Sequence, residues 1–178
     1  MRQKRAVFLD RDGVINEVLT SRVRFVNKPS QLYFLEGVPQ AIRKLNQQFD
    51  YIFVVTNQGG VGLGFMKEQQ LRNIHKHMIE QLAAEGATIH DVAYCPHKPR
   101  AGCECRKPGS KMISDLADKY DVDLSCSYMV GDRDTDIQAG KRVGTKGVFL
   151  GVSDPLADAA FPDLLSASDW IIKDTRES

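Results

Sequence analysis

Short apolar runs alternate along this chain with segments whose apolar residues recur at helical spacing. The runs are the expected strands, at residues 6–9, 51–55, 89–94, 127–130 and 147–150. The amphipathic segments are the expected helices, at residues 37–48, 67–85, 110–121 and 134–143. Four to six apolar residues suit a buried strand, whereas a stripe repeating every three or four positions suits a helix. Strands that alternate with helices predict a parallel sheet covered by helices on both faces.

The length of 178 residues favours one domain, and no repeat or linker divides the chain. We therefore predict an α/β fold, a single Rossmann-like three-layer domain over residues 1–178. Its sheet is expected to be mainly parallel, with no large cap domain. A further strand is expected at residues 169–172, whereas the rest of the tail carries no interpretable motif.

Residues 16–36 show no clean period and contain a proline, so we predict a loop with a short extended piece at 22–26. A loop of that length in a compact domain is usually functional. His75 and His77 fall on one expected helix, but side chains two positions apart do not face each other. We therefore expect solvated or partly buried histidines there and no shared metal site.

Charge and apolar patterning exclude some partners. The formal net charge is +1, so no global basic field favours nucleic acid. No apolar run is long enough to span a membrane. The apolar run after the basic N-terminus ends at Asp10, too early for a signal peptide. We expect a cytoplasmic protein, and a monomer because no uncovered apolar stripe is evident.

Polar groups follow the expected strands. Asp10 and Asp12 come directly after the first strand, and Thr56 follows the second. Asp132 ends the fourth, and Lys107 follows a cysteine-rich loop. Alone, the acid pair and the glycine after it are equally typical of a solvated turn. However, parallel strands bring their carboxyl ends to one edge, so all these groups are expected in a single cleft.

This set of side chains suits phosphoryl transfer. Asp10, Asp12 and Asp132 are ligands for a hard cation such as Mg²⁺. One carboxylate can attack phosphorus, and a second can protonate the leaving oxygen and then activate water. Thr56 and Lys107 can neutralise the phosphoryl oxygens, which is most of what such catalysis requires.

The acids at 132, 134 and 136 also have the spacing of a calcium loop. That reading is disfavoured because Ile137 replaces the glycine at the sixth position and no glutamate stands at the twelfth. For Asp136 two roles stay open. It could orient Lys107, or it could begin a helix, where negative charge is favourable.

Three of the four cysteines crowd around a histidine. Cys95, His97, Cys103 and Cys105 make a complete Cys₃His set for a tetrahedral structural zinc, against the alternative of reduced surface thiols. A zinc-stabilised loop would hold Arg106 and Lys107, which follow directly. Cys126 is expected to be a small buried hydrophobic residue within a strand.

Four motifs, in order, resemble the haloacid dehalogenase superfamily of phosphohydrolases: Phe8-Leu9-Asp10-Arg11-Asp12-Gly13, Val55-Thr56-Asn57-Gln58, Arg106-Lys107-Pro108 and Val130-Gly131-Asp132-Arg133-Asp134-Thr135-Asp136. The resemblance implies that Asp10 is the nucleophile and Asp12 the general acid and base. It implies that Thr56 and Lys107 hold the phosphoryl group. Mg²⁺ would lie between the Asp10 side chain, the Asp12 main-chain carbonyl and Asp132.

The cysteine loop with its following Arg-Lys-Pro is similar to the D-glycero-D-manno-heptose 1,7-bisphosphate 7-phosphatases and the related histidinol-phosphate phosphatases. That resemblance implies substrate-binding roles for Arg11, Val18, Leu19, Thr20, Ser21, Asn57, Gln58, Gly59, Arg106 and Arg133. The chain departs from the heptose enzymes at residues 18–21, which lack their polar and aromatic character, and in a shorter loop between His97 and Cys103. Without a large cap, loops 16–36, 59–66 and 95–109 must shape the pocket, so a small, exposed phosphate ester is expected.

Four functions are compatible with parts of this pattern. The first is a Mg²⁺-dependent phosphatase that removes the 7-phosphate of the heptose bisphosphate through an aspartyl phosphate, in the making of nucleotide-activated heptose. Histidinol phosphate hydrolysis is the alternative within the class. A 3′-phosphatase of nucleic-acid ends is disfavoured by the near-neutral charge. A zinc-stabilised binding module without catalysis is disfavoured because such a module has no need of the acid pair.

Overall fold

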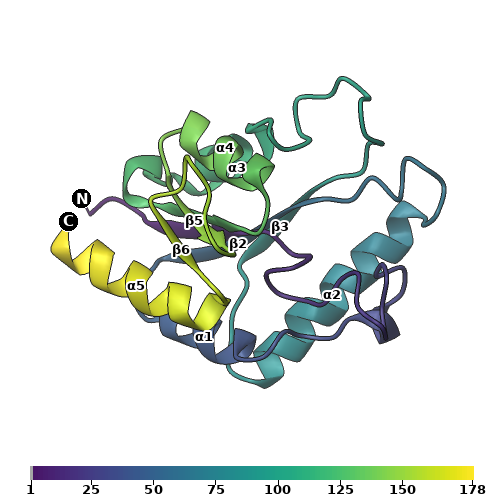
Figure 1. Cartoon of the computed structure of the whole chain (residues 1–178), viewed down its shortest axis with the longest axis horizontal. Helices are drawn as coiled ribbons and strands as arrows, with labels where there is room; N and C mark the ends of the chain where they lie inside the picture. The colour runs from purple at the N-terminus through teal and green to yellow at the C-terminus, as the bar shows by residue number, and fades with distance from the viewer. Residues whose placement is uncertain (1) are drawn as a thin grey trace.

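Six parallel strands form one sheet in the computed structural model, which describes residues 2–178. The strands run in the order β3-β2-β1-β4-β5-β6 across the sheet (Figure 1). Their bounds are β1 Ala6–Leu9, β2 Tyr51–Asn57, β3 Asp91–Cys95, β4 Tyr128–Gly131, β5 Lys146–Leu150 and β6 Ala159–Phe161. The predicted α/β fold with a parallel sheet is confirmed.

Helices cover both faces of the sheet, as Figure 1 shows. Their bounds are α1 Val38–Asn46, α2 Glu68–Ala84, α3 Lys111–Tyr120, α4 Asp134–Arg142 and α5 Leu164–Glu177. Alternate side chains of β1 enter different cores because successive residues of a strand point to opposite faces. Val7 and Leu9 pack with α1, α2 and α5, whereas Ala6 and Phe8 pack with α3 and α4. The three-layer arrangement is therefore confirmed.

The C-terminal segment differs from the prediction. Residues 169–172, expected as a strand, lie inside α5, and the sixth strand is β6. The Asp163 carboxylate begins this helix by accepting a hydrogen bond from the Ser166 N–H. Leu164, Ala167 and Ile171 bury one helical face against the sheet. The apolar run was too short to show its period alone, but the capping residue and this spacing identify the helix.

The long loop between β1 and α1 contains a 3-10 turn at Pro29–Gln31, and in the described chain no strand forms at the extended piece expected at 22–26. Val23 and Val26 from this loop are buried against Ile74 of α2. The loop is therefore anchored by apolar contacts, although it lacks regular pairing.

Two further predictions are wrong. His75 is buried on the inner face of α2, with 5% of its surface exposed, whereas His77 is half-buried as expected. Cys126 lies in a 3-10 turn, Leu124–Cys126, and is only half-buried. Among residues 2–178, no helix combines the length and apolarity needed to cross a membrane.

Candidate active site

The strand order reverses between β1 and β4, and this pair of strands organises the site. The Asp10 N–H donates a hydrogen bond of 3.0 Å to the Val130 carbonyl, which fixes the two strand ends side by side. Asp10 follows β1 and Asp132 follows β4, so their carboxyl groups lie close to each other. Ligands in open α/β sheets bind at such a reversal, outside the carboxyl ends of the strands.

Two glycines let the acids approach. A Cβ atom on Gly13, whose φ is +83°, would lie 2.1 Å from Oδ2 of Asp132. A Cβ atom on Gly131 would lie 2.1 Å from Cβ of Asp136. Neither position can hold a side chain unless an acid moves. Glycine at these two positions therefore leaves the space that the carboxylates of Asp132 and Asp136 occupy.

Lys107 is the centre of the buried charge network. Its Nζ atom lies 2.8 Å from Oδ1 of Asp10 and 2.6 Å from Oδ1 of Asp136, and it donates to the Val55 carbonyl at 2.9 Å. Burial disfavours the ammonium charge, but Asp10 and Asp136 outweigh it and hold the pKa of Lys107 above its usual value. Lys107 is therefore a fixed cation beside the predicted nucleophile.

Asp10, Asp132 and Asp136 form an acidic group in which one carboxylate oxygen from each residue lies within 4.8 Å of the other two. Burial raises the pKa of Asp10 to about 8, although Lys107 opposes the shift. Burial, with the charge of Asp136, also raises the pKa of Asp132, and its buried Oδ1 has no hydrogen-bond partner. A hard divalent cation would stabilise the ionised form of both buried carboxyl groups and would give Oδ1 of Asp132 a partner. The donor set therefore fits Mg²⁺.

Asp136 performs both of the roles left open by the sequence. One oxygen pairs with Lys107, and the other accepts the Arg133 N–H at 3.1 Å at the start of α4. Because both oxygens are already engaged by the chain, the geometry favours a supporting role over direct metal ligation.

Asp12 is held apart from this network. Its Oδ1 atom accepts hydrogen bonds from Nε and Nη2 of Arg11, at 3.1 and 2.8 Å, and from Nδ2 of Asn16, at 2.9 Å. Nε2 of Gln58 donates to Oδ2 at 3.2 Å. Burial works against the charge of Asp12, but Arg11, Asn16 and Gln58 outweigh it and lower the pKa of this carboxyl. The two acids after β1 therefore have different environments.

The end of β2 connects the other predicted site residues. Gln58 Nε2 also donates to the Thr56 hydroxyl at 2.8 Å, and Thr56 is almost fully buried. Asn57 Oδ1 accepts the Lys107 main-chain N–H at 2.9 Å, and its Nδ2 donates to the Lys107 carbonyl at 3.2 Å. Asn57 therefore fixes the Lys107 backbone to the sheet edge, a contact that the motif alone did not reveal.

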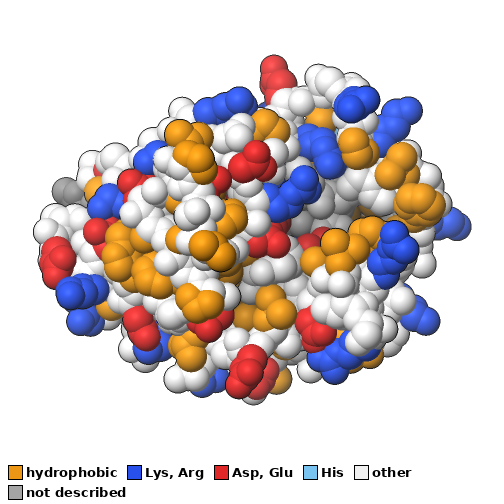
Figure 2. Space-filling model, viewed as in Figure 1, with side chains coloured by type: hydrophobic (Ala, Val, Ile, Leu, Met, Phe, Trp, Pro, Cys, Tyr) orange, Lys and Arg blue, Asp and Glu red, His pale blue; other side chains and the backbone are white. Residues whose placement is uncertain are grey.

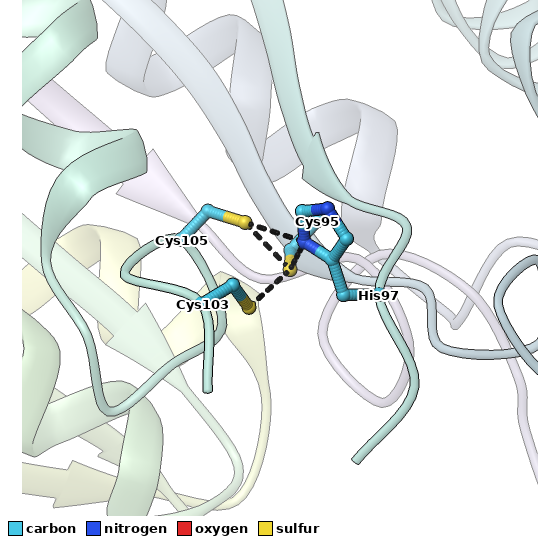
Figure 3. A group of neighbouring side chains, drawn as sticks. All are labelled: Cys95, His97, Cys103 and Cys105. Atoms are coloured by element: carbon cyan, nitrogen blue, oxygen red, sulfur yellow. Dashed lines mark hydrogen bonds between the residues drawn. The ribbon is translucent and has the colours of Figure 1, made fainter. Parts of the chain in front are cut away.

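Cys95, the last residue of β3, points toward His97, Cys103 and Cys105 in the loop that follows (Figure 3). Sγ of Cys95 lies 2.8 Å from Sγ of Cys105, and His97 Nδ1 lies 3.2 Å from the Cys105 sulfur. A hydrogen bond from the Arg106 backbone lowers the pKa of Cys103 to about 6, which favours its thiolate. The donor set fits a tetrahedral zinc ion with no open position.

A cavity of about 690 Å³ lies above the acids. Its lining includes all but two of the predicted substrate-binding residues, namely Arg11, Val18, Leu19, Asn57, Gln58, Gly59, Arg106 and Arg133. Thr20 and Ser21 do not line it, because Thr20 turns back to bond Val23 and both are exposed. Figure 2 shows the surface hollowed to the right of centre, with charged and hydrophobic side chains at the edge.

Sequence reasoning missed three apolar residues of this lining. Phe25, Leu63 and Phe65 line the cavity and are more than half exposed. They come from two of the three loops expected to shape the pocket. Isolated apolar residues in loops carry no periodic signal, so only the fold shows that they share one wall.

His75 was also missed as a site residue. Its Nε2 lies 3.0 Å from Nη1 of Arg11. The sequence does contain a signal that His75 is buried, because position 75 falls within the apolar stripe of α2 formed by Leu71, Ile74 and Met78. A histidine in such a stripe must point inward.

Comparisons with known proteins agree with this geometry. A family model described as HAD-hydrolase-like matches residues 104–177. The crystal structure of D,D-heptose 1,7-bisphosphate phosphatase from B. bronchiseptica, complexed with magnesium and phosphate, superposes with a TM-score of 0.84. It is 32% identical, and the match covers 96% of this chain and 99% of that one. Fold and site therefore define a phosphatase of the HAD-like hydrolase class.

Two curated relatives narrow the class. The D-glycero-beta-D-manno-heptose-1,7-bisphosphate 7-phosphatase of Rhodopseudomonas palustris is 41% identical over 80% of this chain and 81% of its own length. The protein of the same name from Escherichia coli K12 is 34% identical over 94% of this chain and 87% of its own. The chain belongs to the D-glycero-D-manno-heptose 1,7-bisphosphate 7-phosphatase family, whose members are phosphoric monoester hydrolases.

Proposed function

We propose that this protein removes the 7-phosphate of D-glycero-D-manno-heptose 1,7-bisphosphate in a Mg²⁺-dependent reaction, as a step toward nucleotide-activated heptose. The observation that carries the proposal is the separation of two carboxylates at the floor of one cavity. Asp10 lies beside the Lys107 ammonium, whereas Asp12 is held by Arg11 and Asn16. A nucleophile and a proton-transfer group need such different environments.

In the proposed first step an oxygen of Asp10 forms a bond to phosphorus while the bond from phosphorus to the sugar oxygen breaks. Asp12 donates its proton to the departing sugar oxygen. The pKa of Asp12 is low in the free protein, and the negative charge of an arriving phosphate ester raises it, so that the carboxyl can carry that proton.

In the second step Asp12 accepts a proton from water as the water oxygen bonds to phosphorus. The bond between phosphorus and Asp10 breaks, which releases inorganic phosphate and restores the free carboxylate. In this proposal Lys107 keeps its ion pair with Asp10 during attack and offsets negative charge on the phosphoryl oxygens, to which the Thr56 hydroxyl would donate a hydrogen bond.

The proposed Mg²⁺ ligands are the carboxylates of Asp10 and Asp132 and the main-chain carbonyl of Asp12. The ion would supply positive charge against the phosphoryl group. The partnerless buried oxygen of Asp132 supports this assignment, as does the magnesium bound to the B. bronchiseptica enzyme.

We assign the Cys95, His97, Cys103 and Cys105 cluster to a structural zinc. The last of these ligands directly precedes Arg106 and Lys107, so the ion would hold both cations at the cavity. Free thiols in this arrangement fit a reducing, cytoplasmic compartment. We further propose that the enzyme acts as a monomer.

Two arginines support a substrate with a second anionic group. Arg106 and Arg133 both line the cavity, and Nη1 of Arg106 is buried without a hydrogen-bond partner. A second phosphate would satisfy that donor, whereas histidinol phosphate presents a cationic amine. The bisphosphate is therefore the better fit to the charges of this cavity.

The test compares phosphate release from both anomers of the heptose 1,7-bisphosphate and from histidinol phosphate, with Mg²⁺ and with EDTA. We expect Mg²⁺-dependent turnover of a heptose bisphosphate and none by Asp10→Asn. A preference for histidinol phosphate would contradict the proposed substrate. Full turnover by Asp10→Asn would contradict the covalent mechanism.

A further inference from the structure

His75 is buried on α2 at the back of the active site, beside the tilted ring of Tyr94 at 5.8 Å between centroids. Its Nε2 atom lies 3.0 Å from Nη1 of Arg11. A guanidinium can only donate hydrogen bonds, so Nε2 is the acceptor and the ring is neutral. Burial and the nearby charge of Arg11 both lower the pKa of His75, which keeps the ring neutral.

The opposite edge of the same guanidinium faces Asp12. Nε and Nη2 of Arg11 both donate to Oδ1 of Asp12, and only 1% of the surface of Arg11 is exposed. His75 therefore holds one side of this cation and Asp12 the other. No rotation of the guanidinium can leave His75 without also disturbing the bonds to Asp12.

The two oxygens of Asp12 are unequally engaged as a result. Oδ1 accepts two bonds from Arg11 and one from Asn16, whereas Oδ2 accepts only one, at 3.2 Å, from Gln58. A carboxylate oxygen with three donors has no lone pair to spare for a transferable proton. Oδ2 is the oxygen that remains free for proton transfer.

We infer that His75 is a positioning residue that acts through Arg11 to fix the Asp12 carboxylate, leaving Oδ2 as the proton-transfer atom. This inference rests on the proposed role of Asp12 as general acid and base. A neutral acceptor suits the task because it leaves the whole charge of Arg11 to Asp12. An acid at position 75 would compete for the guanidinium.

The discriminating experiment uses leaving groups of different basicity. A sugar oxygen needs the proton of Asp12 as its bond to phosphorus breaks, whereas p-nitrophenolate leaves as a stable anion. His75→Leu removes the acceptor, and His75→Gln keeps one at similar reach. Met78→Ala, a truncation on the inner face of the same helix, controls for lost packing. Met78 is fully buried in the core that α2 shares with α1 and α5, and it does not contribute to the hydrogen bonds of Arg11.

We expect His75→Leu to lower kcat/KM for the heptose bisphosphate by about tenfold to a hundredfold, which is less than most of the roughly 10²–10⁴-fold that a general acid contributes because Asp12 itself is still present. Its kcat/KM for p-nitrophenyl phosphate should change by less than about threefold, and KM for either ester should change little. His75→Gln should restore most of the loss. Met78→Ala should lower the melting temperature while keeping the ratio between the two esters.

Equal losses on both esters, or no rescue by His75→Gln, would overturn the inference and leave His75 a packing residue. The inference would also be overturned if Met78→Ala changed the ratio of kcat/KM between the two esters as much as His75→Leu does. If the unaltered protein released no phosphate from either ester, the proposed function would fail instead. The ¹⁵N spectrum tests separately whether His75 positions Arg11: a slowly exchanging Arg11 Nε–H should be present in the wild type and His75→Gln and lost in His75→Leu.

Discussion

Oδ1 of Asp136 lies 2.6 Å from Nζ of Lys107, and both side chains are almost completely buried. The ammonium has a second partner in Asp10, so the two acids share one cation. Asp136 thereby helps to fix the position of Lys107 beside Asp10. Because a buried charge is costly without its partner, this pair is sensitive to the loss of either member.

Asp136→Asn is expected to lower the free energy of unfolding by about 1–3 kcal/mol, since the buried ammonium keeps one acid and gains only a neutral acceptor. Turnover should fall by at least about tenfold, in the range seen when groups that support a site are removed. Phosphate release and urea denaturation measure the two effects. Asp134→Asn, on an exposed position of the same helix, is the matched control and should be neutral.

Gly13→Ala should weaken Mg²⁺ binding. The added Cβ would overlap Oδ2 of Asp132, so that carboxylate must move. Gly144→Ala is the control, because Gly144 also has a positive φ, +96°, but open space around its Cβ position. Both variants should lose about 1–2 kcal/mol of stability from left-handed strain. Only Gly13→Ala should need several-fold more Mg²⁺ for half-maximal activity, and equal Mg²⁺ requirements would contradict the assignment of Asp132.

Cys103→Ser should lose the proposed zinc. Metal analysis of the wild type is expected to find about one zinc per chain, from one four-ligand site. The variant should bind little zinc and lose at least about tenfold in turnover, as the loop that carries Lys107 loosens. Cys126→Ser, at the half-buried cysteine outside the cluster, should keep both metal and activity. A zinc-free Cys103→Ser with full turnover would refute the structural role.

Asp10→Asn and Asp12→Asn should fail differently. Asp10→Asn removes the nucleophile and should form no phospho-enzyme with any ester. Asp12→Asn keeps its main-chain carbonyl, so it should still bind Mg²⁺ and accumulate phospho-enzyme from p-nitrophenyl phosphate, which needs no proton on leaving. Rapid-quench labelling distinguishes the two variants. Loss of Mg²⁺ binding in Asp12→Asn would require the two roles to be revised.

His75 predicts a pH dependence of stability. Burial and the charge of Arg11 lower its pKa from 6.5 to about 3 in the folded protein, while Asp12 opposes this and the nearby Tyr94 ring is neutral. Between these values the unfolded chain binds more protons, so stability falls as pH drops below 6.5. The loss approaches about 1.4 kcal/mol per pH unit, or about 2 kcal/mol by pH 5.

Urea denaturation of His75→Gln between pH 7 and pH 5 measures this contribution, since glutamine does not titrate. The variant should lose stability less steeply than the wild type. His77→Gln, two positions along the same helix, is the matched control. Parallel curves for His75→Gln and the wild type would show that His75 does not resist protonation.

The sequence predicted the parallel sheet and the convergence of the motifs because both follow from local patterns. Each acid directly follows a buried strand, and parallel strands bring such residues to one edge. To predict that Asp132 lies beside Asp10, one must also know that β4 pairs with β1. Strand order is a tertiary property, and no local pattern contains it.

The errors also have physical causes. Residues 169–172 have strand-like composition, but the helix cap at Asp163 and packing against the sheet decide their structure. His75 was placed near solvent because its partner, Arg11, lies 64 positions away. Thr20 was expected in the pocket, but its own turn with Val23 directs it outward. A contact between distant segments decided the burial of His75, whereas a helix cap and a tight turn, both local, decided the other two cases.

Gly131 has a consequence for how this enzyme can evolve. A side chain there would occupy the space of the Asp136 side chain, so any replacement displaces the partner of Lys107. Gly131 is not among the residues that line the cavity, yet it cannot change independently of the charged residues. Descendants of this chain can explore new substrates through the exposed loop residues Phe25, Leu63 and Phe65, while residues 131 and 136 are inherited as a single unit.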